Sequence, residues 1–94
     1  MRKSKRRKCK IDLATHFIKN AIERNFPLSK LKEMIVRGKW LPHIKEKRRT
    51  CVYKNGTKYW TIIIIPIEQR FRIIVITVYP SHHHEKKKFK YFRE

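Results

Sequence analysis

The sequence predicts an α+β fold in which an N-terminal αα-hairpin packs on an antiparallel β-sheet of three to four strands. Three features indicate this class. Two segments with the apolar periodicity of helices come first, an Asn-Gly turn follows between strand-like runs, and a long β-branched stretch, TIIIIPIEQRFRIIVITVYP, occupies residues 61–80. Two helices on one face of a small antiparallel sheet form an α+β layer. With 94 residues, the chain can bury one modest core but not two.

The β-branched stretch supplies the central pair of strands. Its two apolar runs, Ile62–Ile67 and Ile73–Val78, are separated by a short polar block at residues 68–70. Branching at Cβ stiffens the side chain and favours extended backbone, so the runs predict an antiparallel pair. They show almost no alternation of apolar and polar residues, which predicts that both faces of the sheet are covered near its middle.

Two residues with hydroxyl groups lie at the end of the last strand, which we expect over Phe71–Tyr79. Thr77 and Tyr79 are two residues apart, so they should share a face with Ile73 and Val75. They could line a functional site, or they could only mark the point where the strand leaves the core.

The other two strands flank Asn55-Gly56, because Asn-Gly between strand-like runs is the strongest short-range signal of a hairpin. We expect these strands at Arg48–Tyr53 and Thr57–Ile67, with Val52 opposite Tyr59.

The strands also carry edge signals. Pro66 has no backbone N–H and predicts a bulge or an unpaired edge near the end of its strand. The edge of Arg48–Tyr53 would be exposed, which would allow a homodimer to form through it.

The first helix is expected to begin after Asp12, a good N-cap, and to end before Pro27. Its apolar face consists of Leu13, Ala14, Phe17, Ile18, Ala21 and Ile22. Along one edge of that face, the spacing i, i+4 and i+8 places His16, Asn20 and Arg24 in one row.

The second helix is expected over Lys30–Arg37, with Ser29 as its N-cap and Gly38 as its C-cap. The basic segment Lys39–Arg49, which contains His43, should be mostly loop.

The net charge of +19 is the strongest functional signal in the chain. Residues 1–10 and 81–94 together carry +10 and residues 11–80 carry +9, so the body of the domain is itself basic. Such a field attracts polyanions, of which nucleic acid is the commonest. An anionic membrane surface fits less well, because neither end shows an amphipathic apolar face. For residues 1–10 alone, the alternative is a solvated run of charge.

The charge pattern predicts a basic disordered tail at 1–10, a single α+β domain at 11–80 and a basic, aromatic tail at 81–94. In the last segment, Phe89, Tyr91 and Phe92 lie among cations. They could stack bases, or the segment could lie on the domain as a fourth strand or a helix. The run at residues 82–84 is three histidines, which could ligate a metal. Consecutive histidines cannot all face one ion from regular structure, so we expect no metal or other cofactor.

The sequence predicts a cytoplasmic protein that does not enter a membrane. No segment reaches the roughly 20 apolar residues that span a bilayer, and no apolar run follows the basic N-terminus as in a secretory signal. The two cysteines, Cys9 and Cys51, do not make a disulfide framework or a metal site.

Three segments, THFIKNAIERNFPLSKLKEMIVRGKW, CVYKNGTKYWTIIII and IIVITVYP, resemble a family of small uncharacterised domains in the barnase–EndoU–colicin–RelE superfamily of metal-independent ribonuclease toxins. That family opens with a helix of the form H-x-x-(K/R)-x-x-x-x-R, which is followed by a hydrophobic residue and a Ser-capped second helix ending in Gly. It closes with a strand ending in T-V-Y. These features fall on His16, Lys19, Arg24, Phe26, Ser29, Gly38 and Thr77-Val78-Tyr79. The resemblance leaves both tails outside, and it does not extend to the unusually basic segment Lys39–Arg49.

The resemblance implies a RelE-like fold and RNA cleavage by attack of the 2′-OH, with a 2′,3′-cyclic phosphate as product. His16 would be the acid or base. Arg24 and Lys19 would hold the phosphate, and Thr77 and Tyr79 would donate hydroxyl hydrogen bonds. We expect four further cations to contact RNA, namely Arg48, Arg49, Arg70 and Arg72. An acidic antitoxin or immunity protein would be the partner that covers this basic cleft.

Simpler interpretations of the same residues stay open. His16 could be a solvated or interhelical histidine, Arg24 could pair with a nearby acid, and Thr77 and Tyr79 could be packing residues at a strand end. The alternative function is a basic protein that binds DNA or RNA without catalysis, in a mobile element or virus for example. Such binding would depend mainly on phosphate contacts and would be strongly sensitive to salt.

Overall fold

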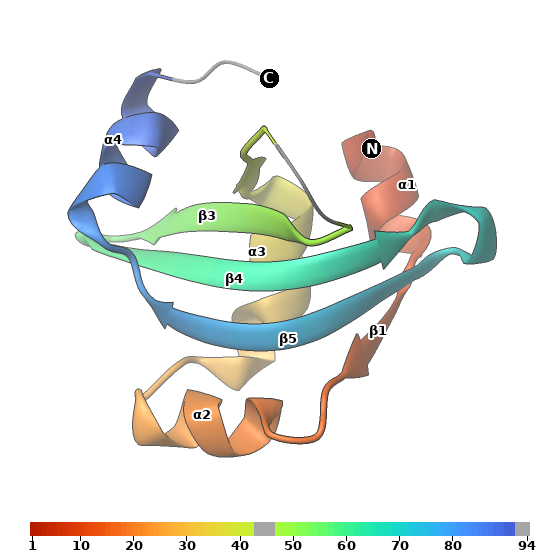
Figure 1. The fold of residues 1–94 in the computed structure, drawn as a ribbon, viewed down its shortest axis with the longest axis horizontal. Coiled ribbons are helices and arrows are strands. Elements are labelled where there is room, and N and C mark those ends of the chain that lie inside the picture. The colour runs from red at the N-terminus through yellow and green to blue at the C-terminus, as the bar shows by residue number, and fades with distance from the viewer. Residues whose placement is uncertain (43–46, 92–94) are drawn as a thin grey trace.

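The computed structural model describes residues 1–42 and 47–91, and Figure 1 shows their arrangement. Within these ranges the chain forms four α-helices and one five-stranded mixed sheet, which confirms the α+β class. The prediction of a three- to four-stranded antiparallel sheet is wrong, because β1 pairs with β5 in parallel. The helices are α1 (Lys3–Lys8), α2 (Phe17–Glu23), α3 (Leu31–Arg37) and α4 (His83–Tyr91). The strands are β1 (Lys10–Leu13), β2 (Lys39–Trp40), β3 (Arg49–Asn55), β4 (Lys58–Ile67) and β5 (Arg72–Pro80), in the spatial order β1-β5-β4-β3-β2.

The two strands that sequence reasoning missed are short and lie at the edges of the sheet. In β1, Asp12 pairs with the Arg72 side chain at 3.2 Å and does not cap a helix, so α2 starts only at Phe17. At the other edge, β2 pairs with β3. The segment Lys39–Arg49 is therefore not all loop, and the β3 edge that suggested a homodimer is covered at Cys51 and Val52. His43 lies outside the described residues.

The main core lies between the sheet and the helices α2 and α3. Buried side chains alternate along β4 at Trp60, Ile62 and Ile64, and this face of the sheet meets α3, which lies behind it in Figure 1. Only a narrow stripe of α2 packs inward, at Phe17 and Ala21. The predicted apolar face of the first helix is thus wrong in part: Ile18 and Ile22, which were assigned to it, are 49% and 63% exposed.

The start and end of α3 differ in how well the sequence predicted them. A 3₁₀ turn, η1 (Leu28–Lys30), precedes the helix, and Ser29 lies inside this turn instead of capping α3. Gly38 is the C-cap as predicted. Glycine is needed here because neighbouring atoms approach its Cα closely, and not because the backbone is left-handed. An added Cβ would lie 2.5 Å from Cys51 Sγ and 2.6 Å from the Met34 carbonyl oxygen.

The β3–β4 hairpin forms where the Asn-Gly signal placed it, with a different register. The turn residues are Gly56, which has a φ of 65°, and Thr57, so that Asn55 pairs with Lys58. Val52 consequently lies opposite Thr61 and not opposite Tyr59. The shift is two residues, so the side chains of β4 keep their faces.

Pro66 lies in β4 beyond the last β3–β4 pair, Arg49–Ile64, so its missing N–H falls where β4 pairs with β5 only. An unpaired edge position was one of the two alternatives predicted for this proline.

A β-bulge in β5 changes which residues share a face. The β4–β5 register shifts between Ile63 and Ile64, where Ile63 pairs with Thr77 and Ile64 pairs with Val75. The extra residue moves Thr77 and Tyr79 to the face opposite Ile73 and Val75, because side chains alternate along β4. The prediction that these four residues share one face is therefore wrong.

Residues 1–10 do not form the predicted disordered tail. α1 is held by the buried Arg6 side chain, whose guanidinium donates hydrogen bonds to the carbonyl oxygens of Val36 at 3.2 Å and Gly38 at 3.0 Å. These carbonyls belong to the C-terminal end of α3, where a cation is electrostatically favourable. The guanidinium also lies 4.1 Å from the centre of the Trp40 ring, so the N-terminal segment is part of the folded core.

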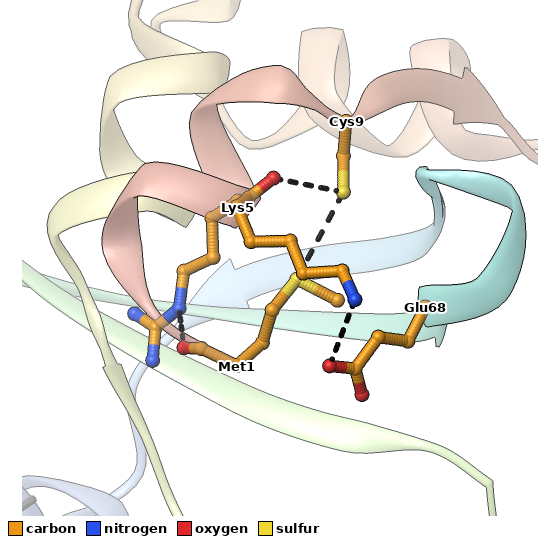
Figure 2. Close-up of polar contacts among 5 residues, drawn as sticks. Met1, Lys5, Cys9 and Glu68 are labelled. Carbon is orange, nitrogen blue, oxygen red and sulfur yellow. Dashed lines mark hydrogen bonds and ion pairs between the residues drawn. The ribbon is translucent and has the colours of Figure 1, made fainter.

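A second set of contacts fixes the end of α1 against the β4–β5 connection, as Figure 2 shows. The Lys5 ammonium pairs with Glu68 at 3.1 Å. The buried Cys9 thiol donates to the Lys5 carbonyl oxygen at 3.2 Å and lies 3.8 Å from the Met1 sulfur. Burial raises the pKa of the Cys9 thiol, which favours its neutral form inside this cluster.

Candidate nucleic-acid interface

The row of residues predicted on the first helix is present, with His16 at its exposed start. His16 occupies the N-cap position of α2, and no side-chain capping bond holds it. The backbone carbonyl of His16 accepts from the Asn20 N–H at 3.2 Å, and that of Asn20 accepts from the Arg24 N–H at 3.1 Å. The three residues therefore follow one another along one side of α2.

The Asn20 and Arg24 side chains contact the free edge of β5. The Asn20 amide donates to the Thr77 hydroxyl at 3.4 Å, and the Arg24 guanidinium donates to the Val78 carbonyl oxygen at 3.0 Å. β1 covers this edge of β5 only as far as Val75, so α2 covers the next residues. This geometry gives Arg24 a structural role, satisfying a strand-edge carbonyl, and no described acid pairs with it.

Thr77 and Tyr79 make their contacts on different helices. Thr77 contacts α2 through Asn20, whereas the Tyr79 hydroxyl donates to Glu85 of α4 at 2.6 Å. Burial, followed by the hydrogen bond to the Glu85 carboxylate, raises the pKa of Tyr79. Tyr79 is therefore a neutral donor whose hydrogen is already engaged, and the described contacts do not gather His16, Thr77 and Tyr79 around one point.

The other predicted cations are spread over the surface. Lys19 is exposed on α2, and Arg48 and Arg70 are exposed next to β3 and in the β4–β5 connection. Arg72 pairs with Asp12, and the half-buried Arg49 donates to the Leu41 carbonyl oxygen at 3.4 Å.

The main feature that sequence reasoning left undecided is α4, which lies beside the β3–β4 hairpin end of the sheet (Figure 1). Of the alternatives for residues 81–94, a helix lying on the domain is confirmed for His83–Tyr91, while Phe92 lies outside the described residues. Glu85 is 4% exposed and accepts from Tyr79 and, at 2.8 Å, from the His82 N–H at the start of the helix. Ser81 shares a 2.7 Å hydrogen bond with the buried Thr61 hydroxyl.

One side of α4 is fixed to the sheet and the other faces solvent. With about 3.6 residues per turn, Glu85 and Phe89 lie on the same side of the helix. The Phe89 ring packs edge-on against Tyr59, with 5.4 Å between ring centres, and Lys39 donates to the Phe89 carbonyl oxygen at 2.6 Å. The opposite side carries His83, Lys86, Lys87, Lys90 and Tyr91, which line an open hollow of about 250 Å³.

The β3–β4 hairpin extends this basic surface. The ammonium groups of Lys54 and Lys86 lie 5.6 and 5.8 Å from the centre of the Tyr59 ring, so the hairpin and the helix meet there. Lys58, also in the hairpin, lies 4.4 Å from the centre of the Trp60 ring and therefore on the other face of the sheet. We call the combined set the hairpin–α4 surface: Lys54, His83, Lys86, Lys87, Lys90 and Tyr91.

The carboxylates of the described chain lie elsewhere or are already engaged. The ion pairs found within residues 1–42 and 47–91 join α1, α3, β1, β5 and the β4–β5 connection. Hydrogen bonding to Arg7 is the main cause that lowers the pKa of Glu33, which pairs with Arg7 and Arg37. Among described residues, no carboxylate pairs with a lysine of the hairpin–α4 surface, and Glu85 beneath it is buried against Tyr79.

The histidine run packs with aromatic rings. The His82 ring lies 4.9 Å from that of Tyr79 and 5.9 Å from that of His84. Over the part of the chain that is described, no three His, Cys, Asp or Glu side chains are placed to hold a metal ion. Within the same residues, no helix has the length and apolar character needed to cross a membrane. Comparison with protein-family models, curated proteins and solved structures finds no match for this chain.

Proposed function

We propose that this protein binds nucleic acid through phosphate contacts made by the hairpin–α4 surface. The observation that carries the proposal is a group of lysines without described carboxylate partners, on a helix whose opposite side is fixed to the sheet by Glu85 and Phe89. A net charge of +19 supplies a long-range field that attracts a polyanion to this surface.

Binding of this kind is driven by release of counterions from the nucleic acid. Affinity should therefore fall steeply with salt, and each phosphate contact contributes a slope of about −0.7 for single strands and about −0.9 for duplexes in a plot of log K against log salt. Neutralising three contacting lysines should make that slope shallower by up to about 2 for single strands and by up to about 3 for duplexes.

The test is fluorescence anisotropy of a short labelled oligonucleotide, titrated between about 50 and 200 mM salt, the range over which phosphate-driven binding weakens most visibly. The variant is Lys86→Gln/Lys87→Gln/Lys90→Gln, and the matched control is Lys3→Gln/Lys8→Gln/Lys30→Gln. The control removes the same charge from exposed lysines on α1 and η1 that make no described ion pair. We expect weaker binding and a shallower slope for the α4 variant than for the control. Equal effects of the two triple variants would refute the assignment of binding to this surface.

We propose RNA cleavage at the α2–β5 edge as a second function, within a RelE-like variant of the α+β fold. The supporting observation is that His16, Asn20 and Arg24 follow one another along α2 beside Thr77 and Val78. His16 is exposed there, next to the cation Lys19. An acidic antitoxin-like protein is the partner that this function implies.

The test for cleavage is incubation of labelled RNA with the protein in EDTA, beside His16→Ala, followed by mapping of the fragment ends. Cleavage that survives EDTA, leaves 2′,3′-cyclic phosphates and is lost in the variant would support a metal-independent ribonuclease. A 5′-phosphate at the cut, or RNA that stays intact while binding is normal, would contradict it.

A further inference from the structure

We infer that the hairpin–α4 surface selects single-stranded over duplex nucleic acid, by stacking one unpaired base on the ring of Tyr91. This inference rests on the proposed binding function and adds the form of nucleic acid that the surface takes. It starts from an aromatic side chain that makes no contact with another ring or polar group among the described residues.

Tyr91 is 78% exposed at the end of α4. Other aromatic rings near this surface are engaged in the fold. Tyr59 and Phe89 pack on each other, Trp60 is buried against Phe26, and Tyr79 donates to Glu85. No hydrogen bond or ring contact of Tyr91 is present among the described residues. Its exposed phenol ring can offer a flat face to a ligand.

The neighbours of Tyr91 suit the rest of a nucleotide. Lys87 lies one helical turn before Tyr91, on the same side of α4, and Lys86 and Lys90 line the same hollow. A base that lies on the Tyr91 ring would therefore place its flanking phosphates near ammonium groups. His83 also lines the hollow and can donate a hydrogen bond to a phosphate oxygen.

The size of the hollow favours a single nucleotide unit. At about 250 Å³ it is smaller than the pockets of roughly 300–1,000 Å³ that enclose whole small molecules. The hollow is open and is lined mainly by basic side chains, so it does not need to enclose a whole strand.

A duplex cannot make the same contact, since its bases are stacked on one another and present only their edges in the grooves. An unpaired base has a free face, and base–aromatic stacking tolerates any base because each has a π-face. The lysines can bind both single strands and duplexes through phosphate contacts, whereas Tyr91 can stack only on the unpaired base of a single strand.

The experiment compares the affinity of Tyr91→Leu, Tyr91→Phe and the unchanged protein for a short single strand and for the duplex of the same sequence. Leucine keeps the helix propensity and the apolar bulk but removes the aromatic face. We expect Tyr91→Leu to weaken single-strand binding by about 5- to 150-fold, the range that loss of one stacking ring covers. Duplex binding should not change, and Tyr91→Phe should bind the single strand as well as the unchanged protein.

Two outcomes separate this inference from the proposed function. If Lys86→Gln/Lys87→Gln/Lys90→Gln weakens both forms but Tyr91→Leu affects both equally or neither, the surface binds nucleic acid and the base-stacking inference is wrong. If the lysine variant weakens neither form more than its matched control does, the proposed function itself fails. A single strand carrying 2-aminopurine gives an independent readout, because stacking on Tyr91 should quench its fluorescence and Tyr91→Leu should abolish that quenching.

Discussion

The N-terminal segment gives the sharpest test of the fold, through the substitution Arg6→Ala. The Arg6 guanidinium is buried and donates to the carbonyl oxygens of Val36 and Gly38 at the end of α3. Hydrogen bonds to a charged group contribute about 1.5–3 kcal/mol each, and the contact with the Trp40 ring adds about 1–2 kcal/mol. Relief of the desolvation of a buried charge offsets part of this sum. We therefore expect a net loss of about 3 kcal/mol in the free energy of unfolding.

For a domain of this size, such a loss lowers the unfolding midpoint by about 12–24 °C. The assay is thermal and urea unfolding followed by circular dichroism, with Arg7→Ala as the matched control. Arg7 lies on the same short helix and carries the same charge, but its pairing with Glu33 is exposed, so its removal should change stability far less. If Arg6→Ala is as mild as Arg7→Ala, α1 does not pack on α3 and residues 1–10 are the solvated tail that their composition suggests.

Three other substitutions test the contacts that organise the rest of the chain. Gly38→Ala should cost about 1–3 kcal/mol of stability, measured by urea unfolding, because the added methyl group has no space beside the α3 carbonyl. Tyr79→Phe should destabilise the protein, since Glu85 loses a buried donor. The folded pKa of Tyr79 lies above its unfolded value, so the stability it contributes is complete below about pH 10 and is lost as the pH rises further. The difference in unfolding free energy between the unchanged protein and Tyr79→Phe should be constant from neutral pH to about pH 10 and should shrink above it. A difference that grows above about pH 10 would contradict a raised pKa of Tyr79 in the folded state. Arg24→Ala should lower the unfolding midpoint, because the Val78 carbonyl loses its donor, and should leave oligonucleotide affinity unchanged. A large loss of affinity without a loss of stability would show that Arg24 contacts the nucleic acid.

The parts of the fold that the sequence predicted well are those set by local chemistry. The Asn55-Gly56 signal located the β3–β4 hairpin, and the isoleucine-rich runs became β4 and β5. Gly38 ended α3 at the predicted residue. Turn preference, β-branching and helix termination each depend on a few consecutive residues, so they can be predicted from a short stretch of sequence.

The parts that could not be predicted depend on partners far away in the chain. Arg6 looks like one cation among many until the α3 carbonyls, about thirty residues later, are placed beside it. β1 is four residues long, and it resembles the start of a helix because its parallel partner in β5 lies about sixty residues away. Contacts at such separations leave no periodic signal in a short segment.

The positions of the candidate site residues could not be predicted fully either. A single extra residue in β5 moved Thr77 and Tyr79 to the opposite face, and no turn residue marks that bulge in the sequence. α4 did have a local signal, since Glu85 lies in its first turn and Lys88 and Lys90 lie in its last turn. This is the charge order that favours a helix. Only the tertiary contacts of Glu85 and Phe89 decide which side of that helix faces solvent.

Mapping of the bound surface by backbone amide NMR, during titration with a short single strand, tests the central claim most directly. We predict that the largest shifts fall on residues 83–91 and on the β3–β4 hairpin around residues 54–58, with little change on α1. Shifts that concentrate instead around His16 and Thr77, with α4 unperturbed, would contradict binding at the hairpin–α4 surface and would place the nucleic acid at the α2–β5 edge.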